Sequence, residues 1–243
     1  MLSIRAQRKP VNVMHHYKMT RTIIIIILTS FIFISCGNPK VTPSKNDKEV
    51  VQQSLDTTKA VKIDKYWVEP KESFEYNSLG NFTNDTLKLI TCSEYVFSPF
   101  GSLREKAELK TSMLKNFSVI SRVDTMKNGE FEFNVLNLKT SKLILFFNDD
   151  PEASRSSYVF KGEINDSDVK FRDNIRIGMS KEDFIRTFFK TFPNELLQRY
   201  KVIVLESCVT DIWHTYTFIG NKLKAVSFKT DSWWAVDYEK FKK

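Results

Sequence analysis

Apolar and polar residues alternate along much of the chain with a period of two. Runs such as "TLKLIT", "FEFNVLNL" and "IWHTYTFI" place every second side chain on an apolar face. This alternation is typical of β-strands that bury one face. Asn128-Gly129 and Gly220-Asn221 separate neighbouring runs, and such dipeptides favour tight hairpins. Strands are therefore predicted over residues 117–126, 130–138, 142–149, 200–209, 212–219 and 222–231, with further strands within 85–97, 156–164 and 169–177.

Residues 101–117 follow a helical period instead. Ser102 and Glu105 have the spacing of a capping box, in which a hydroxyl and a carboxylate satisfy backbone amides at a helix start. The apolar residues of this stretch fall on one broad face of a helix. They are Leu103, Ala107, Leu109, Met113, Leu114 and Phe117.

A second helix is predicted over residues 178–192. Ser180 with Asp183 is a shorter-armed version of the same capping device, and Pro193 ends the helix because proline cannot continue it. The apolar residues recur at helical spacing and predict one buried face. They are Phe184, Ile185, Phe188, Phe189 and Phe192.

The order of these elements predicts the fold class. Each helix is followed by three strands, so a helix and an antiparallel meander occur twice, in possible halves 65–168 and 169–243. Helices that lie on one face of an antiparallel sheet make an α+β fold. We therefore predict a single α+β domain over residues 65–243.

The most apolar run of the chain lies near its start. Residues 23–34 are about half as long as the roughly 20 apolar residues that a spanning helix needs. Five basic residues and no acidic residue precede the run, and Ser35 and Cys36 follow it. This layout is typical of a secretory signal over residues 1–35. The alternative is a buried strand that ends in a cysteine by chance. The basic residues before the run favour the signal over this alternative.

The position of Cys36 directly after small Ser35 resembles the lipobox of bacterial lipoproteins. The resemblance implies that Cys36 carries acyl chains, which would hold the protein on a membrane surface without spanning the membrane. Residues 36–64 are polar and read as a solvated tether. The segment after Cys36 has no acidic run, which favours an outer-membrane anchor that faces the periplasm.

Charge does not point to nucleic acid. The chain has a net charge of +8, but its first 35 residues hold five of the 37 basic residues and none of the 29 acidic ones. The remainder carries 32 basic and 29 acidic residues, a net charge of +3. A domain so nearly balanced gives no argument for a nucleic-acid partner.

Cys92 and Cys208 are the remaining cysteines. An exported protein meets an oxidising compartment, where a disulfide between them could form. Each cysteine also lies in an apolar strand-like run, where a free buried thiol is ordinary. Connectivity needs geometry, so both alternatives stay open.

The second half resembles a known family at "IRIGMSKEDFIRTFFK" and "WHTYTFIGNKLKAVSF", within residues 175–228. Gly178, Met179 and Ser180 open a helix as in the SmpA/OmlA (BamE) family of outer-membrane lipoproteins and the related β-lactamase-inhibitor-protein fold. The second stretch is similar to the family's aromatic strand, turn and closing strand. The resemblance implies a scaffold or protein-binding role without catalysis, and it names no cofactor.

Catalytic and metal-binding groups are sparse. His214 is the only histidine after the signal, and its strand-like surroundings favour a surface or hydrogen-bonded histidine over a catalytic one. Ser112 and Lys115 match S-x-x-K, but the other elements of that hydrolase class are missing. We expect no catalytic residue, no metal site and no cofactor, with a hydrolase as the remote alternative.

Aromatic residues near the C-terminus are the first candidates for a partner surface. Trp234, Tyr238 and Phe241 recur at helical spacing, so this segment could seal the sheet as a short amphipathic helix. In an extended segment, Trp233 and Trp234 would lie on opposite faces and one could anchor a partner. The predicted partner surface is Trp213, Tyr216, Trp233, Trp234, Tyr238 and Phe241.

The sequence thus predicts a lipid-anchored envelope protein that binds another envelope protein. The alternative is a periplasmic carrier of an apolar small molecule, because the chain's 20 Phe could line a pocket as well as fill a core.

Overall fold

The computed structural model describes residues 58–81, 83–126, 129–147, 157–209 and 211–230. These residues belong to one unit that spans residues 53–243. Their strands form a nine-stranded sheet and a three-stranded sheet. The strands are β1 (Val61–Ile63), β2 (Tyr66–Pro70), β3 (Tyr76–Leu79), β4 (Thr86–Thr91), β5 (Ser118–Met126), β6 (Gly129–Leu138), β7 (Ser141–Phe146), β8 (Val159–Ile164), β9 (Phe189–Thr191), β10 (Val202–Ser207), β11 (Ile212–Ile219) and β12 (Lys222–Thr230).

The helical elements of the described residues are short. Three are α-helices: α2 (Glu94–Phe97), α3 (Lys181–Phe188) and α4 (Asn194–Arg199). Three are 3-10 helices: η1 (Glu72–Phe74), η2 (Lys106–Lys110) and η3 (Arg172–Asn174).

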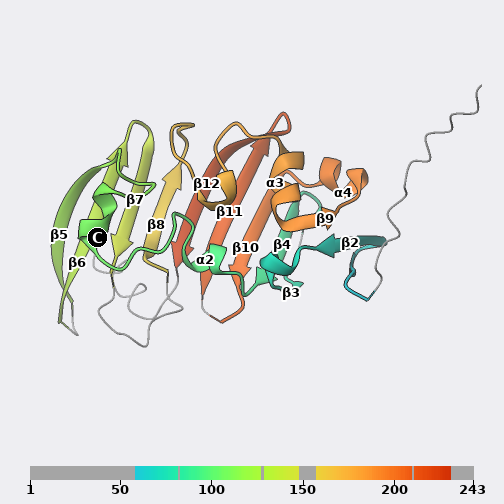
Figure 1. The fold of residues 1–243 in the computed structure, drawn as a ribbon, viewed down its shortest axis with the longest axis horizontal. Coiled ribbons are helices and arrows are strands. Elements are labelled where there is room, and N and C mark those ends of the chain that lie inside the picture. Colours follow the sequence, from blue (N-terminus) through green and yellow to red (C-terminus); the bar gives the residue numbers. More distant parts are fainter. Residues whose placement is uncertain (1–57, 82, 127–128, 148–156, 210, 231–243) are drawn as a thin grey trace, which may run out of the picture. The chain divides into compact units, whose positions relative to one another are not determined.

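The nine-stranded sheet has the order β3-β4-β10-β11-β12-β8-β7-β6-β5 (Figure 1). Strands that follow one another in sequence form two antiparallel meanders, β5 to β8 and β10 to β12. Antiparallel pairing of β12 with β8 joins the meanders. The pair β4 and β10 is parallel, with Thr86 opposite Val202 and Thr91 opposite Ser207. The small sheet has the order β1-β2-β9.

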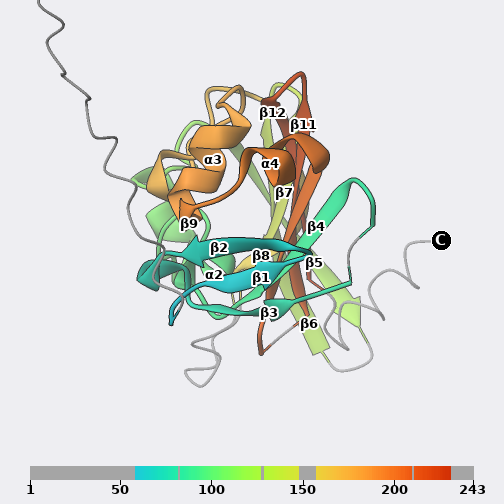
Figure 2. The ribbon, with the colours of Figure 1, turned by 90° about the vertical axis from the view of Figure 1, so that its right-hand side faces the viewer.

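The main core lies on the face of the large sheet that the helices cover (Figure 2). Alternation along β11 buries Ile212, His214, Tyr216 and Phe218 on this face. Phe184 of α3 packs on the sheet, with its ring centroid 4.6 Å from that of Tyr216. Close aromatic packing of this kind adds to the free energy gained from burial alone.

A smaller apolar cluster is separate from the main core. It consists of buried Phe133, Ile144 and Phe160, with half-buried Phe131 and Phe146 packed against it. Ile144 and Leu143 are neighbours on β7, yet Leu143 belongs to the main core. Since successive side chains of a strand point to opposite faces, the small cluster lies on the other face of the sheet.

The predicted helix-packed α+β fold is wrong. The described residues are mostly β-structure in a mixed sheet, and their α-helices have four, eight and six residues. The helix predicted over residues 101–117 is replaced by η2 and a series of turns. Ser112 explains part of the failure, because its Oγ donates to the Leu109 carbonyl and accepts from the Leu114 amide. Such local bonds compete with helical backbone bonds.

The second predicted helix forms, but it is shorter than expected. α3 ends at Phe188, and Ser180 caps its start by accepting a hydrogen bond from the Asp183 amide at 3.0 Å. Residues 189–191 leave the helix and pair with β2 as β9. Pro193 precedes α4 and does not end the long helix that was predicted.

Most predicted strands are confirmed. The strand predicted over residues 169–177 and the predicted end of the tether at residue 64 are wrong. Residues 169–177 contain η3 in place of a strand. β1 lies at 61–63, inside the segment predicted to be a tether over residues 36–64. The halves 65–168 and 169–243 also share one sheet, because β4 of the first half pairs with β10 of the second. The signal 1–35 and Cys36 lie outside the described residues.

Gly162 of β8 offers a test of the junction between the meanders, since it pairs with Leu143 of β7 and with Phe228 of β12. A Cβ at this position would lie 2.4 Å from the Lys142 carbonyl oxygen. We expect Gly162→Ala to lower the free energy of unfolding by about 1–3 kcal/mol, as overpacking does, measured by urea denaturation.

Gly220→Ala is the matched control for that substitution. Gly220 has a φ of 55°, but a Cβ there would meet no atom within 4 Å. We expect a loss of only about 1–2 kcal/mol from backbone strain in the control. Gly162→Ala no more costly than the control would contradict the close contact with β7.

Candidate functional site

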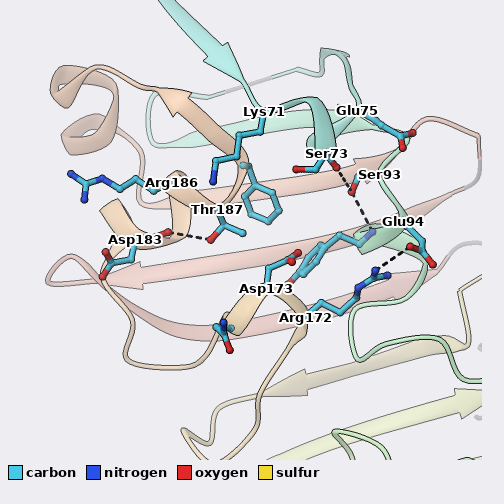
Figure 3. A pocket seen from close by; sticks show the side chains of 13 residues that line it. Lys71, Ser73, Glu75, Ser93, Glu94, Arg172, Asp173, Asp183, Arg186 and Thr187 are labelled. Carbon is cyan, nitrogen blue, oxygen red and sulfur yellow. Dashed lines mark hydrogen bonds and ion pairs between the residues drawn. The ribbon is translucent and has the colours of Figure 1, made fainter. Parts of the chain in front are cut away.

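A depression of about 720 Å³ opens between four segments of the chain on the helix-covered face (Figure 3). The segments are residues 71–75, 93–95, 172–174 and 183–188, which belong to η1, α2, η3 and α3 with their flanks. Its lining is mostly polar: Lys71, Ser73, Glu75, Ser93, Glu94, Tyr95, Arg172, Asp173, Asn174, Asp183, Arg186, Thr187 and Phe188.

The η1 wall is anchored by an aromatic side chain. Phe74 is buried, and its ring centroid lies 4.9 Å from that of Phe188 and 5.5 Å from that of Phe189. Glu75 follows η1 with a φ of 44°, in the left-handed region. Its carbonyl accepts from the Cys92 amide at 3.1 Å and from the Thr91 hydroxyl at 3.2 Å. These bonds hold η1 against the end of β4.

The α2 wall is fixed by a cap and a covalent link. Ser93 caps α2, and its Oγ accepts from the Tyr95 amide at 3.3 Å. Directly before it, Cys92 is disulfide-bonded to Cys208, with 5.1 Å between the two Cα atoms and 116 residues between them in sequence. A link that closes so long a loop restricts the unfolded chain and favours the folded one.

The η3 wall contains two consecutive residues with left-handed backbone. Asp173 has a φ of 57° and Asn174 a φ of 59°. Buried Phe171 and Ile175 on either side hold this turn, and the Phe171 amide donates to the Ile175 carbonyl at 2.9 Å. Together with Glu75, three non-glycine residues of this depression have positive φ, a costly conformation that is enriched at functional sites.

Arg172 and Glu94 connect the η3 and α2 walls. Arg172 Nη2 lies 3.0 Å from Glu94 Oε2, and the Arg172 amide donates to the Pro99 carbonyl at 2.8 Å. Arg172 Nη1 is buried and forms no hydrogen bond within the described part of the chain. The side chain of Glu94 is 67% exposed, so water screens this pair and its main effect is to orient the guanidinium.

Tyr95 reaches from the depression into the core. Its hydroxyl accepts from the Tyr216 hydroxyl at 3.0 Å, and the Tyr216 oxygen lies 3.5 Å from His214 Nδ1. Burial raises the pKa of both tyrosines, so both stay neutral. Burial also lowers the pKa of His214 from its usual 6.5 to about 3, so the imidazole is neutral at neutral pH.

Opposite charges face the open part of the depression. Lys71 and Asp173 project toward it from different walls (Figure 3). Within the described residues, the side chains of Lys71, Glu75 and Asp173 form no hydrogen bond or ion pair. These charges remain available to a ligand that carries groups of both signs.

A second depression, also about 720 Å³, lies between α4 and the turn from β11 to β12. Two lysines line it: Lys201 is exposed, and Lys181 is buried with its Nζ donating to the Tyr200 carbonyl at 2.8 Å. Burial lowers the pKa of Lys181. Ile219, which also lines it, is 66% exposed. This depression offers apolar surface and a lysine already engaged by the fold.

The lining of the first depression is rich in carboxylates, hydroxyls and guanidinium groups. Its lining includes no histidine and no free thiol. Among the residues that the structure describes, no group of three or more His, Cys, Asp or Glu side chains is placed to hold a metal ion. The arrangement is suited to binding by charge and hydrogen bonds.

The predicted partner surface is only partly described. Trp213 is half-buried on the face of the sheet opposite the helices, with Lys229 Nζ 5.5 Å from its ring centroid. Tyr216 is fully buried, so its assignment to a partner surface is wrong. The physical reason is the odd spacing of three residues, which places Trp213 and Tyr216 on opposite faces of β11. Trp233, Trp234, Tyr238 and Phe241 lie outside the described residues.

Sequence reasoning assigned no charged residue of the depression to a binding site, although it named Asp183 as part of a helix cap. Lys71, Glu75 and Arg172 come from segments far apart in the chain, and nothing local marks them as neighbours. One signal was present: Asp173-Asn174 in "FRDNI", because these residue types tolerate left-handed backbone and favour turns. The alternation of apolar residues around them favoured a strand instead.

Comparison with known proteins finds no match to a family model, a curated protein or a solved structure. The resemblance to the SmpA/OmlA (BamE) family therefore stays a prediction. Of the helices in the described residues, none has the length and apolar character required to cross a membrane.

Buried His214 predicts a pH dependence of stability. The unfolded chain binds a proton at this residue near pH 6.5, whereas the folded chain does so only near pH 3. The free energy of unfolding should therefore fall as the pH is lowered from 6.5 toward 3, by up to ~1.4 kcal/mol per pH unit from this group.

His214→Leu should remove that contribution and flatten the pH dependence between pH 3 and 6.5. Urea denaturation at several pH values, with the unsubstituted protein measured in parallel, checks this expectation. Equal slopes for the two proteins would show that His214 is not buried in its neutral form.

Proposed function

We propose that this protein is a lipid-anchored envelope protein that binds a polar, charged segment of another envelope protein, and that the first depression is the binding site. Binding without catalysis is the role that the lining residues support. The observation that carries the proposal is the presence of unpaired charges of both signs in an open polar depression: Lys71 and Glu75 on the η1 wall and Asp173 on the η3 wall.

The charges argue for a polar protein segment as the ligand. A lysine and two carboxylates within one site match a partner that carries acidic and basic groups at a fixed separation. Electrostatic complementarity of this kind supplies orientation and specificity more than affinity. An apolar ligand would leave these charges desolvated and unpaired, at a considerable cost in free energy.

The contacts that hold the walls of the depression argue for a site that is formed before the ligand binds. The disulfide of Cys92 and the Ser93 cap hold the α2 wall in place, and the Phe74 anchor holds the η1 wall. A preformed site loses less conformational entropy on binding. The left-handed backbone of Glu75, Asp173 and Asn174 fits the same interpretation, because strain is retained where the surroundings enforce it.

The apolar-carrier alternative has weaker support. The second depression is the more apolar of the two, but Ile219 at its rim stands 66% exposed. Sites for apolar small molecules enclose most of the ligand surface.

Site-specific crosslinking in the native envelope tests the proposed site. A photoreactive residue at position 71 should capture one reproducible protein partner, because Lys71 reaches into the depression. Position 142 is the matched control, since Lys142 is an exposed lysine on the opposite face of the sheet. Mass spectrometry identifies the captured protein.

Charge substitutions in the same assay decide whether the depression recognises that partner. Lys71→Glu or Asp173→Lys, with the photoreactive residue at neighbouring position 73, should each reduce capture about tenfold, since each replaces an attractive contact by a repulsive one. Equal capture from positions 71 and 142, or capture unaffected by both substitutions, would refute the depression as the site.

The membrane anchor is tested separately. Cys36→Ser should move the protein from the membrane fraction to the soluble fraction, because acyl chains on Cys36 would supply the attachment. Mass spectrometry of the N-terminal peptide reports the modification directly. A protein that stays with the membrane after Cys36→Ser, or a native Cys36 peptide without acyl chains, would contradict the anchor.

A further inference from the structure

The two edges of the large sheet differ in kind. At one edge, β3 has four residues, and its pairing with β4 is interrupted by a register shift between Tyr76 and Ser78. At the other edge, β5 has nine residues and pairs with β6 from Ser118 to Met126 without a shift. Short and irregular strands protect an edge from pairing with another chain, and long regular strands do not.

The β5 edge holds the charged residues Arg122 and Asp124, but it lacks the two residue types that most often protect an open strand. Its sequence, "SVISRVDTM", contains neither proline nor lysine. Val119, Ile120 and Val123 are 38%, 61% and 58% exposed, so apolar side chains project on both faces of the strand. An exposed, regular and apolar edge strand is a template for strand addition.

We propose that β5 is a dimerisation strand, which pairs antiparallel with β5 of a second copy of this chain and joins two nine-stranded sheets. The charges of the strand are self-complementary. When Val123 lies on the two-fold axis, Arg122 of each copy stands directly opposite Asp124 of the other. Two such pairs form, and opposite charges across paired strands are stabilising.

Neighbouring registers are excluded by the same two residues. In a two-fold antiparallel pair, opposite residues point to the same face, so the register moves in steps that keep this parity. One step places Arg122 opposite Arg122, and the step in the other direction places Asp124 opposite Asp124. Like charges directly opposite one another are destabilising, so the charges select the register centred on Val123.

The ion pair within β5 leaves room for these contacts. Arg122 Nε lies 2.5 Å from Asp124 Oδ1, while the Arg122 side chain remains 53% exposed. Asp124 Oδ2 accepts no hydrogen bond from the described residues and is buried. Guanidinium groups have several donors, so the exposed Arg122 of the second copy can approach the accessible part of the Asp124 side chain while the bond within the strand persists.

This inference goes beyond the proposed binding function and does not depend on the depression. β5 contributes no residue to the lining of that site. Its test is the oligomeric state of the full chain in mild detergent, by sedimentation or native mass spectrometry. The unsubstituted chain should show a concentration-dependent dimer and no larger assemblies.

Charge reversal gives the decisive comparison. Arg122→Asp places acidic residues opposite each other, and Asp124→Arg places basic residues opposite each other. Each variant alone should weaken the dimer by at least about tenfold. An equimolar mixture of the two variants should restore dimers as heterodimers, because one copy then carries two acidic and the other two basic residues at these positions. If the substitutions weakened the dimer only by breaking the Arg122–Asp124 ion pair within each strand, mixing the two variants would not restore it.

Crosslinking tests the register independently of stability. Val123→Cys should form an intermolecular disulfide under mild oxidation, since residue 123 would face its own counterpart. Thr125→Cys is the matched control, because residue 125 would face residue 121 and lie several residues from its counterpart. The unsubstituted chain, oxidised in parallel, shows whether Cys36 forms an intermolecular disulfide without the introduced cysteine.

Three results would overturn the proposal. They are a monomer at all concentrations, a mixture of charge variants that stays monomeric, and equal crosslinking from positions 123 and 125. Open-ended aggregates in place of a dimer would identify the edge as an aggregation surface. A different protein crosslinked at position 123 in the envelope, in place of a second copy, would identify the edge as a site for a foreign strand.

Discussion

The parallel pairing of β4 with β10 is the contact on which the rest of the structure depends. It places a strand from residues 86–91 beside one from residues 202–207, and the disulfide of Cys92 and Cys208 fixes the ends of both strands. Parallel neighbours cannot be joined by a tight turn, so this pair has to be closed by distant parts of the chain. Once it is closed, η1 and α2 are carried to α3 and η3, and the polar depression exists.

Sequence periodicity predicted the local part of this architecture well. The strands of both meanders follow from alternation and from hairpin turns, and the start of α3 follows from the Ser180 cap. It failed where side-chain competition decides, as at Ser112, whose hydroxyl replaces helical bonds. It failed at Tyr216 for a different reason, because the partner surface was chosen by residue type without regard to the parity of the strand.

The nonlocal part could not be predicted from periodicity at all. Neither the parallel pair nor the depression has a signal within one segment, since the lining residues lie as far apart as Lys71 and Thr187. Cys92 and Cys208 carried the one hint of long-range closure, but two cysteines in apolar runs are equally compatible with free thiols. The polar depression is lined by helical segments and their flanks, and no residue of β5 contributes to it. The proposed binding site and the proposed dimerisation strand therefore do not compete for the same residues.

The separation of β4 from β10 also sets an order of events. A chain leaves the ribosome from its N-terminus, so β4 is made more than a hundred residues before the strand that pairs with it in parallel. The meander of β5 to β8 needs only neighbours in sequence and can form during that interval. Contacts between residues distant in sequence form slowly because a large loop must close first. The junction of β4 with β10 is thus among the last parts of the sheet to assemble, and the depression beside it exists only after β10 has been made.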